Sequence, residues 1–479
     1  MCGIVFVKGP LAGKMVREAL EKIGHRGPDQ SSIWELDDVS IGFVRLQITG
    51  SLDEGNQPQI FHNKTIATNG EIYNSERLIN RYRLPYFACD IDVILPLYHQ
   101  IGVEIVNELD GFYSSIIFDH GEGTVTCLRD HIGKKPLFAG RASGHVFIAS
   151  ELKAFDSVDS FEEVPLGVSV VDLKNGTTQQ TTTVPLLPTR RTLQEIFVDA
   201  VEKRIPPVGQ PFGVFLSGGL DSSLVASIVS RSRPDAVYFT LSGDTNQDGQ
   251  SVEEVISFLG LKNIRRVQIP DAEDLDALIP AVVQATESFN PSIVSNGLGT
   301  FLLAQAARKE GIKVILGGEG ADELFGGYHS FHSASDPWKS TRTRLIEDMH
   351  RTELRRLDLA SMAHSVEVRC PFLDREMRAF SDTLTHEEMY NTSANKYILR
   401  KTFTGFLPDS ILMRKKTSLD VGSGIRAMVV SYLRREGASE RDALRQLWLE
   451  RFNYDSAHPY FSEYPVFDHL IDRRGGEHS

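Results

Sequence analysis

The stretch VFLSGGLDSSLV (residues 214–225) decides the fold of the second half of the chain. Its apolar start predicts a strand that ends at Leu216, and two glycines after it permit a tight turn with exposed backbone N–H groups. We expect residues 221–223 to supply the caps of a helix that follows. Amide donors, hydroxyls and the positive helix end would then face one point, as phosphate binding requires. The alternative is an ordinary strand, turn and helix without a ligand.

Apolar strands and helical segments alternate on both sides of this stretch. Helical spacing of apolar residues begins at Leu193, while AVYFTL (residues 236–241), FLLAQAARKEG (301–311) and IKVILGGEG (312–320) follow the turn. This alternation predicts a parallel sheet covered by helices, and we expect the chain to be mostly helical from Lys339 onward. The Walker string GxxxxGK[S/T] is absent from the sequence, so the phosphate chemistry is of another kind.

The first part of the chain has a different pattern. Short apolar runs separated by turn residues predict layered sheets, with a helix at residues 91–100 packed outside. The polar, proline-containing stretch TTTVPLLPTRRT (residues 181–192) interrupts this pattern. We therefore predict two domains, at residues 1–185 and 193–479.

The composition limits the possible partners. The chain has 479 residues and a formal charge of 51 − 64 = −13, and it contains no long run of Lys and Arg, so we expect no nucleic acid partner. Four cysteines without CxxC spacing indicate a reducing compartment and no structural zinc, with Cys127 and Cys370 as core residues. No apolar stretch approaches the roughly 20 residues that span a bilayer. We expect a cytoplasmic protein that acts on small molecules, with no membrane partner.

The chain opens MCGIVFV, with a cysteine at position 2. In one interpretation Cys2 is incidental, a small residue that leads into an apolar strand. In the other, removal of Met1 frees the α-amine of Cys2, so that one residue carries both a thiol nucleophile and a base. The unperturbed pKa of an α-amine is about 7.7–8.0, which suits a group that takes up a proton and returns it.

Three motifs carry a resemblance to a known family. SGGLDSS (residues 217–223) resembles the pyrophosphate-binding loop of ATP pyrophosphatases, which cleave ATP to AMP and pyrophosphate. LGGEGADELFGGY (316–328) and SMAHSVEVRCPFLD (361–374) narrow the resemblance to the synthetase domain of glutamine-dependent asparagine synthetases. The implied fold is an α+β N-terminal-nucleophile glutaminase of layered antiparallel sheets, joined to an α/β parallel-sheet ATP pyrophosphatase domain with a helical C-terminal region.

Four amino-terminal motifs resemble the glutaminase of the same family: HRGPD (residues 25–29), VRLQI (44–48), NGEIYN (69–74) and CDID (89–92). The resemblance implies that Cys2 is the nucleophile. A glutamine pocket also needs a cation, an anion and oxyanion donors. The implied glutamine ligands are Arg45 for the α-carboxylate, Glu71 and Asp90 for the α-ammonium, and Asn69 with the Gly70 N–H for the oxyanion. Each of these residues alone would more often be structural.

The resemblance also implies the residues of the synthetase site. The ATP-binding set is Leu216, Ser217, Gly218, Gly219, Asp221, Ser222, Leu241, Gly317, Gly318 and Glu319. Asp221 and Asp322 would hold Mg²⁺ against ATP, because this ion prefers a few carboxylates together with phosphates; a solvated acidic loop is the alternative. Glu319 and Lys396 would be catalytic, although Lys396 read without the family would be a solvated lysine on an amphipathic helix.

The expected activity is glutamine-dependent amidation of aspartate to asparagine through an acyl-adenylate, with Tyr328, Glu367 and Arg369 near the acceptor. We expect a shielded passage for ammonia, and a homodimer is left open. The segments SGDTNQDGQSVEEV (residues 242–255) and KKTSLDVGSGI (415–425) depart from the expected pattern. A sugar uronate therefore remains an alternative acceptor, and a catalytically inactive regulatory relative is a further alternative. SGGLDSS argues against a phosphoribosyl amidotransferase, and Cys2 argues against a β-lactam synthetase.

Overall fold

A computed structural model of the chain describes residues 2–51, 54–242, 248–328, 338–391 and 394–462. Its contacts divide the chain into two compact units. The first unit comprises residues 1–185 with 451–455, and the second comprises residues 186–450 with 456–479. Within the described residues, none of the helices combines the length and the apolar character needed to cross a membrane.

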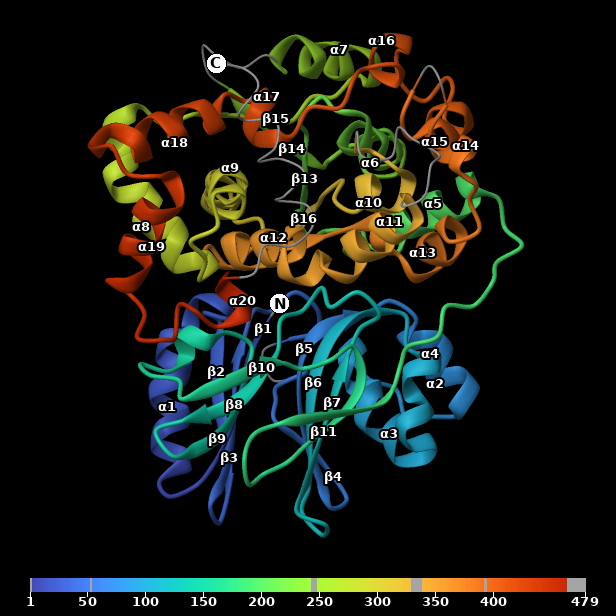
Figure 1. The fold of residues 1–479 in the computed structure, drawn as a ribbon. Helices are drawn as coiled ribbons and strands as arrows, with labels where there is room; N and C mark the ends of the chain where they lie inside the picture. Colours follow the sequence, from blue (N-terminus) through green and yellow to red (C-terminus); the bar gives the residue numbers. More distant parts are fainter. Residues whose placement is uncertain (1, 52–53, 243–247, 329–337, 392–393, 463–479) are drawn as a thin grey trace. The chain divides into compact units, whose positions relative to one another are not determined.

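In the first unit two antiparallel sheets lie face to face (Figure 1). In spatial order, the first sheet consists of β10 (Ser160–Glu163), β8 (Phe138–Ala142), β9 (His145–Ala149), β1 (Cys2–Lys8), β3 (Val39–Arg45) and β2 (Gln30–Leu36). The second consists of β12 (Thr178–Thr182), β11 (Gly167–Val171), β7 (Thr124–Arg129), β6 (Gly111–Asp119), β5 (Lys64–Ile72) and β4 (Gln59–Phe61). Apolar residues of both sheets, among them Phe6 and Ile116, form the core between them.

Helices cover the outer faces of both sheets. Helix α1 (Ala12–Lys22) packs on the first sheet, where a Cβ on Gly42 of β3 would come within 2.4 Å of the Val16 side chain. Apolar residues of the second sheet pack against α2 (Ser75–Tyr82), α3 (Ile94–Ile101) and α4 (Ile105–Glu108). These four layers confirm the predicted fold class of this half.

The helix predicted at residues 91–100 has a different start. A 3-10 turn, η2 (Asp90–Val93), comes first, and the α-helix begins at Ile94. Pro96 lies in the first turn of α3, where a missing N–H leaves no hydrogen bond unmade. The interruption leaves Asp90 in the tighter turn, at the pocket described below.

The second unit contains a parallel sheet covered by helices (Figure 1). Its strands, in spatial order, are β15 (Ile264–Gln268), β14 (Val237–Ser242), β13 (Gly213–Phe215), β16 (Val314–Leu316) and β17 (Glu367–Arg369). From β13 the chain first builds β14 and β15 on one side, and then returns to build β16 and β17 on the other. The neighbouring carboxyl ends of β13 and β16 therefore form a topological switch point, where open α/β sheets bind ligands.

The helices of this unit begin with α5, whose Thr192 and Glu195 form a capping box. The helices are α5 (Leu193–Glu202), α6 (Leu220–Ser232), α7 (Gly249–Leu259), α8 (Leu275–Thr286), α9 (Pro291–Lys309), α10 (Ala321–Phe325), α11 (Trp338–Glu347), α12 (Glu353–Met362), α13 (Arg375–Ser381), α14 (His386–Met389), α15 (Tyr397–Thr402), α16 (Asp409–Leu412), α17 (Leu419–Gly422), α18 (Ile425–Leu433), α19 (Glu440–Leu449) and α20 (Pro459–Ser462). The prediction of a mostly helical region after Lys339 is confirmed, with the short edge strand β17 as an exception.

Candidate active sites

Cys2 begins β1, and the strand register places it opposite Arg45 of β3. The backbone nitrogen of Cys2 donates a hydrogen bond to Oδ1 of Asn69 on β5 at 3.0 Å. This bond fixes the orientation of the amide, because Oδ1 is the acceptor. Nδ2 of Asn69 is buried and has no hydrogen-bond partner among the described residues. A buried donor next to a thiol is the arrangement that an oxyanion needs.

A pocket adjoins Cys2, and the predicted glutamine ligands Arg45, Gly70, Glu71 and Asp90 line it. The pocket therefore contains one guanidinium and two carboxylates, which match the two charges of a free amino acid. Asp90 is held in place by the Thr49 hydroxyl at 3.1 Å and by the backbone N–H of Ile72 at 2.5 Å. The predicted removal of Met1 concerns a residue outside the described residues.

Cys89, the first residue of the CDID motif, also lines this pocket, although no role was predicted for it. Its sulfur lies 3.6 Å from Nη2 of Arg45, and the same Nη2 donates to the Thr49 carbonyl at 3.1 Å. Burial, followed by the charge of Asp92, raises the pKa of the Cys89 thiol to about 11. Cys89 is therefore a protonated thiol near neutral pH. Cys127 and Cys370 are buried, as predicted.

The turn after β13 differs from the prediction in its capping. The N-cap of α6 is Gly219, which has no side chain, whereas residues 221–223 were expected to cap the helix. The hydroxyl of Ser222 turns back instead and accepts a hydrogen bond from the Ser217 N–H at 3.1 Å. A helix start without a side-chain cap leaves N–H groups available for an anion. Gly218 has φ +71°, and a Cβ there would come within 2.8 Å of the Val252 nitrogen.

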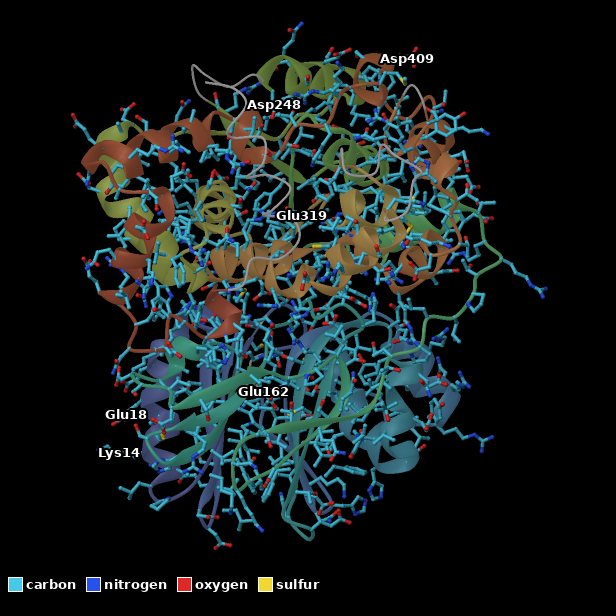
Figure 2. The ribbon with its side chains drawn as sticks, viewed as in Figure 1. Lys14, Glu18, Glu162, Asp248, Glu319 and Asp409 are labelled. Atoms are coloured by element: carbon cyan, nitrogen blue, oxygen red, sulfur yellow. The ribbon has the colours of Figure 1, made fainter. Side chains whose placement is uncertain are left out.

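The turn after β16 meets the turn after β13 at the switch point. A Cβ on Gly318 would lie 2.8 Å from the Ser222 nitrogen and 2.9 Å from the Asp221 Cβ, so glycine permits this approach. One pocket is lined by residues of both turns together with Leu241. The predicted residues Gly218 and Gly317 lie in these turns but are not among the residues that line the pocket. The predicted residues that line it are Leu216, Ser217, Gly219, Asp221, Ser222, Leu241, Gly318, Glu319, Asp322, Tyr328 and Lys396. Figure 2 shows Glu319 inside this unit, whereas Asp409 lies at its outer surface.

Two lysines and two aspartates form the charged centre of this pocket. Nζ of Lys396 lies 2.6 Å from Oδ2 of Asp221 and 2.6 Å from Oδ1 of Asp322, while Lys416 lies 2.5 Å from Oδ2 of Asp322. Burial raises the pKa of Asp322, but the charges of Lys396 and Lys416 outweigh it and lower that pKa to about 2. Asp322 is therefore ionised at neutral pH. Lys416 is not among the predicted site residues, although it lies in KKTSLDVGSGI, a segment that departs from the expected family pattern.

A second group of charges lines the same pocket. The Tyr328 hydroxyl donates to Glu323, and burial, together with Asp322 and Glu353, raises the pKa of Glu323 to about 7. The buried Arg356 pairs with Glu353 and donates to the Thr300 hydroxyl at 3.0 Å. Arg356 lies on α12, and no motif in the sequence pointed to it.

Two predicted acceptor residues do not line this pocket. Glu367 and Arg369 lie on β17, and Nε of Arg369 donates to Oε1 of Glu367 at 2.7 Å. Nη1 of Arg369 donates to the Arg204 carbonyl at 3.0 Å. Both side chains are buried, because residues two apart on a strand point to the same face, which is covered here. Their geometry therefore gives no support to a role in binding the acceptor.

Arg414 also lines this pocket, although no sequence motif pointed to it. It donates to the Gly218 carbonyl at 2.9 Å and pairs with Asp248. Asp248 belongs to the segment 242–255, which departs from the expected family pattern. Of that segment, residues 242 and 248–255 are described, and residues 243–247 lie outside the described residues. Arg414 thus attaches the chain that carries Lys416 to the turn after β13.

Comparison with known proteins identifies the family. The model of the glutamine amidotransferase domain family matches residues 1–184, and that of the asparagine synthase family matches residues 192–346 and 333–454. Asparagine synthetase [glutamine-hydrolyzing] 1 of Arabidopsis thaliana is 32% identical over 462 residues, which cover 88% of this chain and 78% of the relative. The nodule asparagine synthetase of Pisum sativum is 33% identical over 471 residues, with the same coverage. A probable asparagine synthetase of Dictyostelium discoideum is 31% identical over 484 residues, which cover 88% of this chain and 85% of the relative. The chain belongs to the family of glutamine-hydrolysing asparagine synthetases.

Proposed function

We propose that the chain hydrolyses glutamine in its first unit and uses the ammonia in its second unit to convert aspartate to asparagine, while ATP is cleaved to AMP and pyrophosphate. The observation that carries this proposal is that Cys2 and Arg45 line one pocket while Asn69 is hydrogen-bonded to Cys2, in a chain of this family whose other pocket lies at a topological switch point. The two pockets supply the two chemistries that the family name combines.

In the glutaminase half, Cys2 attacks the side-chain amide carbon of glutamine. Nδ2 of Asn69 and the N–H of Gly70 donate to the oxygen that becomes negative in the tetrahedral intermediate. Once Met1 is removed, the nitrogen of Cys2 is an α-amine that takes up the thiol proton and returns it to the leaving ammonia. Water then hydrolyses the resulting γ-glutamyl thioester, which releases glutamate and restores the thiol. The hydrogen bond from this nitrogen to Oδ1 of Asn69 supports the role, because it holds the amine and the oxyanion donor in one orientation.

Glutamine is recognised through its two backbone charges. Arg45 binds the α-carboxylate, since a guanidinium can donate two parallel hydrogen bonds to it. Glu71 and Asp90, which line the same pocket, bind the α-ammonium through their carboxylates. These assignments predict that γ-aminobutyramide, which lacks the α-carboxylate, is a poor donor.

In the synthetase half, the uncapped start of α6 and the hydroxyls of Ser217 and Ser222 hold ATP phosphates. The aspartate β-carboxylate attacks the α-phosphorus and displaces pyrophosphate, which forms a β-aspartyl-adenylate. Ammonia then displaces AMP from this mixed anhydride, because AMP is a far better leaving group than oxide. Lys396 and Lys416 supply positive charge where the phosphate charge develops.

Asp221 can hold magnesium, and Asp322 would join it by giving up a lysine, since its two carboxylate oxygens pair with Lys396 and Lys416. Oδ1 of Asp221 is buried and has no hydrogen-bond partner among the described residues, so an oxygen ligand is available. Among those residues, no cluster of three or more His, Cys, Asp or Glu side chains has the geometry to hold a metal, which agrees with an ion shared with ATP phosphates. When bound, the ion would neutralise phosphate charge.

We place the enzyme in the cytoplasm. Each of the four cysteines, all within the described residues, is a thiol rather than half of a disulfide, as expected in a reducing compartment.

The pocket in the second unit also contains carboxylates and the guanidinium of Arg356, which are complementary to the ammonium and the α-carboxylate of a free amino acid.

The proposal is tested with glutamine that carries nitrogen-15 in its amide. The protein is incubated with this glutamine, ATP, Mg²⁺ and L-aspartate, and the products are analysed by mass spectrometry. We expect asparagine with one nitrogen-15, together with glutamate, AMP and pyrophosphate in equal amounts. If aspartate gives glutamate but no labelled amide, and a sugar uronate in its place gives a labelled amide, then the uronate is the acceptor. Formation of ADP would overturn the proposed reaction.

A further inference from the structure

Glu151 is a buried carboxylate that contacts three basic side chains. It lies between β9 and the 3-10 turn η4 (Leu152–Ala154), and its side chain has no exposed surface. Nη1 of Arg26 lies 2.5 Å from Oε1, Nζ of Lys153 lies 2.9 Å from Oε2, and Nε2 of His25 lies 3.1 Å from Oε2. His25 and Arg26 belong to the HRGPD motif, so Glu151 joins two segments that are far apart in the chain.

Arg26 connects Glu151 to the nucleophile. Nε of Arg26 donates to the backbone carbonyl of Cys2 at 2.9 Å, and Arg26 is fully buried. The guanidinium is planar and rigid, so a carboxylate that holds Nη1 also fixes the direction of Nε. Glu151 therefore acts on the peptide group of Cys2 through one intervening side chain.

The residue before Glu151 holds the same strand. The backbone N–H of Ser150 donates to the Ile4 carbonyl at 3.0 Å, and the Ser150 hydroxyl accepts from the Ile4 N–H at 3.1 Å. Residues 150 and 151 thus fix β1 at Ile4 directly and at Cys2 through Arg26. Two fixed points on either side of Gly3 determine the direction in which the Cys2 side chain leaves the strand.

The charges in this cluster are compatible with a permanently ionised Glu151. Burial raises the pKa of Glu151, but the charges of Lys153, His25 and Arg26 outweigh burial and hold this pKa well below its usual range. The buried Arg26 and Lys153 in turn depend on this carboxylate, because a buried charge is stable only when it is paired. Neither Arg26 nor Glu151 is among the residues that line the pocket at Cys2.

We infer that Glu151 is a positioning residue for the glutaminase reaction, which holds Arg26 so that the peptide of Cys2, and with it the thiol, has the orientation for attack on the glutamine amide. This inference rests on the proposed function. Glu151 touches no reacting atom, so it affects the turnover of bound glutamine rather than glutamine binding. Misplacement of a reacting group by about 1 Å can cost on the order of 10²-fold in rate.

The test is the variant Glu151→Gln, which keeps the shape and an acceptor oxygen but removes the charge. We expect kcat for glutamine hydrolysis to fall by on the order of 10- to 100-fold, with KM for glutamine changed by less than about threefold. Asparagine synthesis from added ammonia should stay within about twofold of wild type, because the second unit is unaltered. The matched control is Glu163→Gln, which removes a largely buried carboxylate that pairs with Arg129 at 3.4 Å. The control should retain glutamine hydrolysis.

A double-mutant cycle tests whether Glu151 acts through Arg26. If it does, Glu151→Gln combined with Arg26→Gln should lose no more activity than Arg26→Gln alone, whereas independent roles would multiply the two losses. If Glu151→Gln fails to fold, Glu151→Asp keeps the charge and shortens the side chain, and the same fall in kcat without a rise in KM is expected. A rise in KM that accounts for the lost activity, an equal loss in Glu163→Gln, or multiplied losses in the cycle would overturn the inference. Wild-type protein without glutaminase activity would instead overturn the proposed function.

Discussion

Nζ of Lys396 lies 2.6 Å from Oδ2 of Asp221, although 175 residues separate them in the sequence. Lys396 comes just before α15 and has φ +50°, in the left-handed region that residues other than glycine seldom occupy. This backbone conformation costs on the order of 1–2 kcal/mol and persists only where the surroundings impose it. This backbone conformation places the Lys396 ammonium where it pairs with both Asp221 and Asp322.

Replacement of Lys396 by methionine should therefore abolish synthesis and spare glutamine hydrolysis. The loss of one charge-stabilising donor typically costs on the order of 10²- to 10³-fold in kcat, and Lys396→Met also leaves Asp221 and Asp322 without their shared cation. The measurement is pyrophosphate release with ammonia as the nitrogen source. The exposed Lys401 on the same helix provides the control, and Lys401→Met should retain activity. Synthesis within tenfold of wild type in Lys396→Met would contradict the assigned role.

Replacement of Cys2 by alanine separates the two activities. Cys2→Ala should lose glutamine-dependent synthesis completely, because the nucleophile is gone, and should keep synthesis from added ammonia within about twofold. The measurement is asparagine formed from each nitrogen source in parallel. Equal loss of both activities in a folded variant is the result that the two-pocket interpretation does not allow.

Cys2 should be the one thiol that reacts rapidly with iodoacetamide near neutral pH. Cys89 lines the same pocket, but a pKa of about 11 leaves roughly one thiol in three thousand ionised at pH 7.5, and the thiolate is the reactive form. Cys127 is buried and its pKa is also raised. Peptide mapping after brief alkylation should find the label on Cys2. Labelling of Cys89 at a similar rate would show that access, rather than ionisation, governs reactivity in this pocket.

The sequence could predict the residues of the switch point because both turns carry local signals. SGGLDSS and LGGEGADELFGGY each combine glycines with polar residues directly after an apolar strand, and parallel strands bring such turns together. Lys416 and Arg356 have no comparable signal, because they reach the pocket through tertiary packing from the helical region. Glu367 and Arg369 were predicted near the acceptor, because they lie in SMAHSVEVRCPFLD, one of the motifs that carry the family resemblance. In the structure they form a buried ion pair with each other on β17 and are not among the residues that line the pocket.

The network behind Cys2 could not be predicted for a related reason. His25 and Arg26 lie in a recognised motif, but Glu151 lies at the end of an apolar strand where a single acidic residue has no periodic or spacing signature. Long-range pairing of this kind depends on the strand order β9-β1-β3, which places the ends of distant strands side by side. The layered architecture itself was predictable, because apolar runs and turn residues alternate at regular intervals.

The stability of the second unit should fall as the pH rises from 5 to 7.5. The pKa of Glu323 is about 7 in the folded protein, above its value near 4.3 in an unfolded chain, so the folded state binds more protons in this range. Deprotonation of buried Glu323 beside Asp322 and Glu353 then costs on the order of 3 kcal/mol. Glu323→Gln keeps an acceptor for the Tyr328 hydroxyl and removes the ionisation. Thermal unfolding should show a smaller decrease in Tm with pH in this variant, and an unchanged decrease would contradict the assignment.

Oxygen-18 transfer provides the most direct test of the acceptor and of the adenylate. In the proposed reaction a side-chain oxygen of aspartate bonds to the α-phosphorus and leaves with AMP when ammonia attacks. With oxygen-18 in that carboxylate, AMP should carry one labelled oxygen and the asparagine amide should retain the other. Succinate, which lacks the α-ammonium, should give no AMP, because a site built to pair that ammonium rejects an analogue that lacks it. Unlabelled AMP would exclude the adenylate, whereas labelled AMP from a sugar uronate but not from aspartate would retain the mechanism and change the substrate.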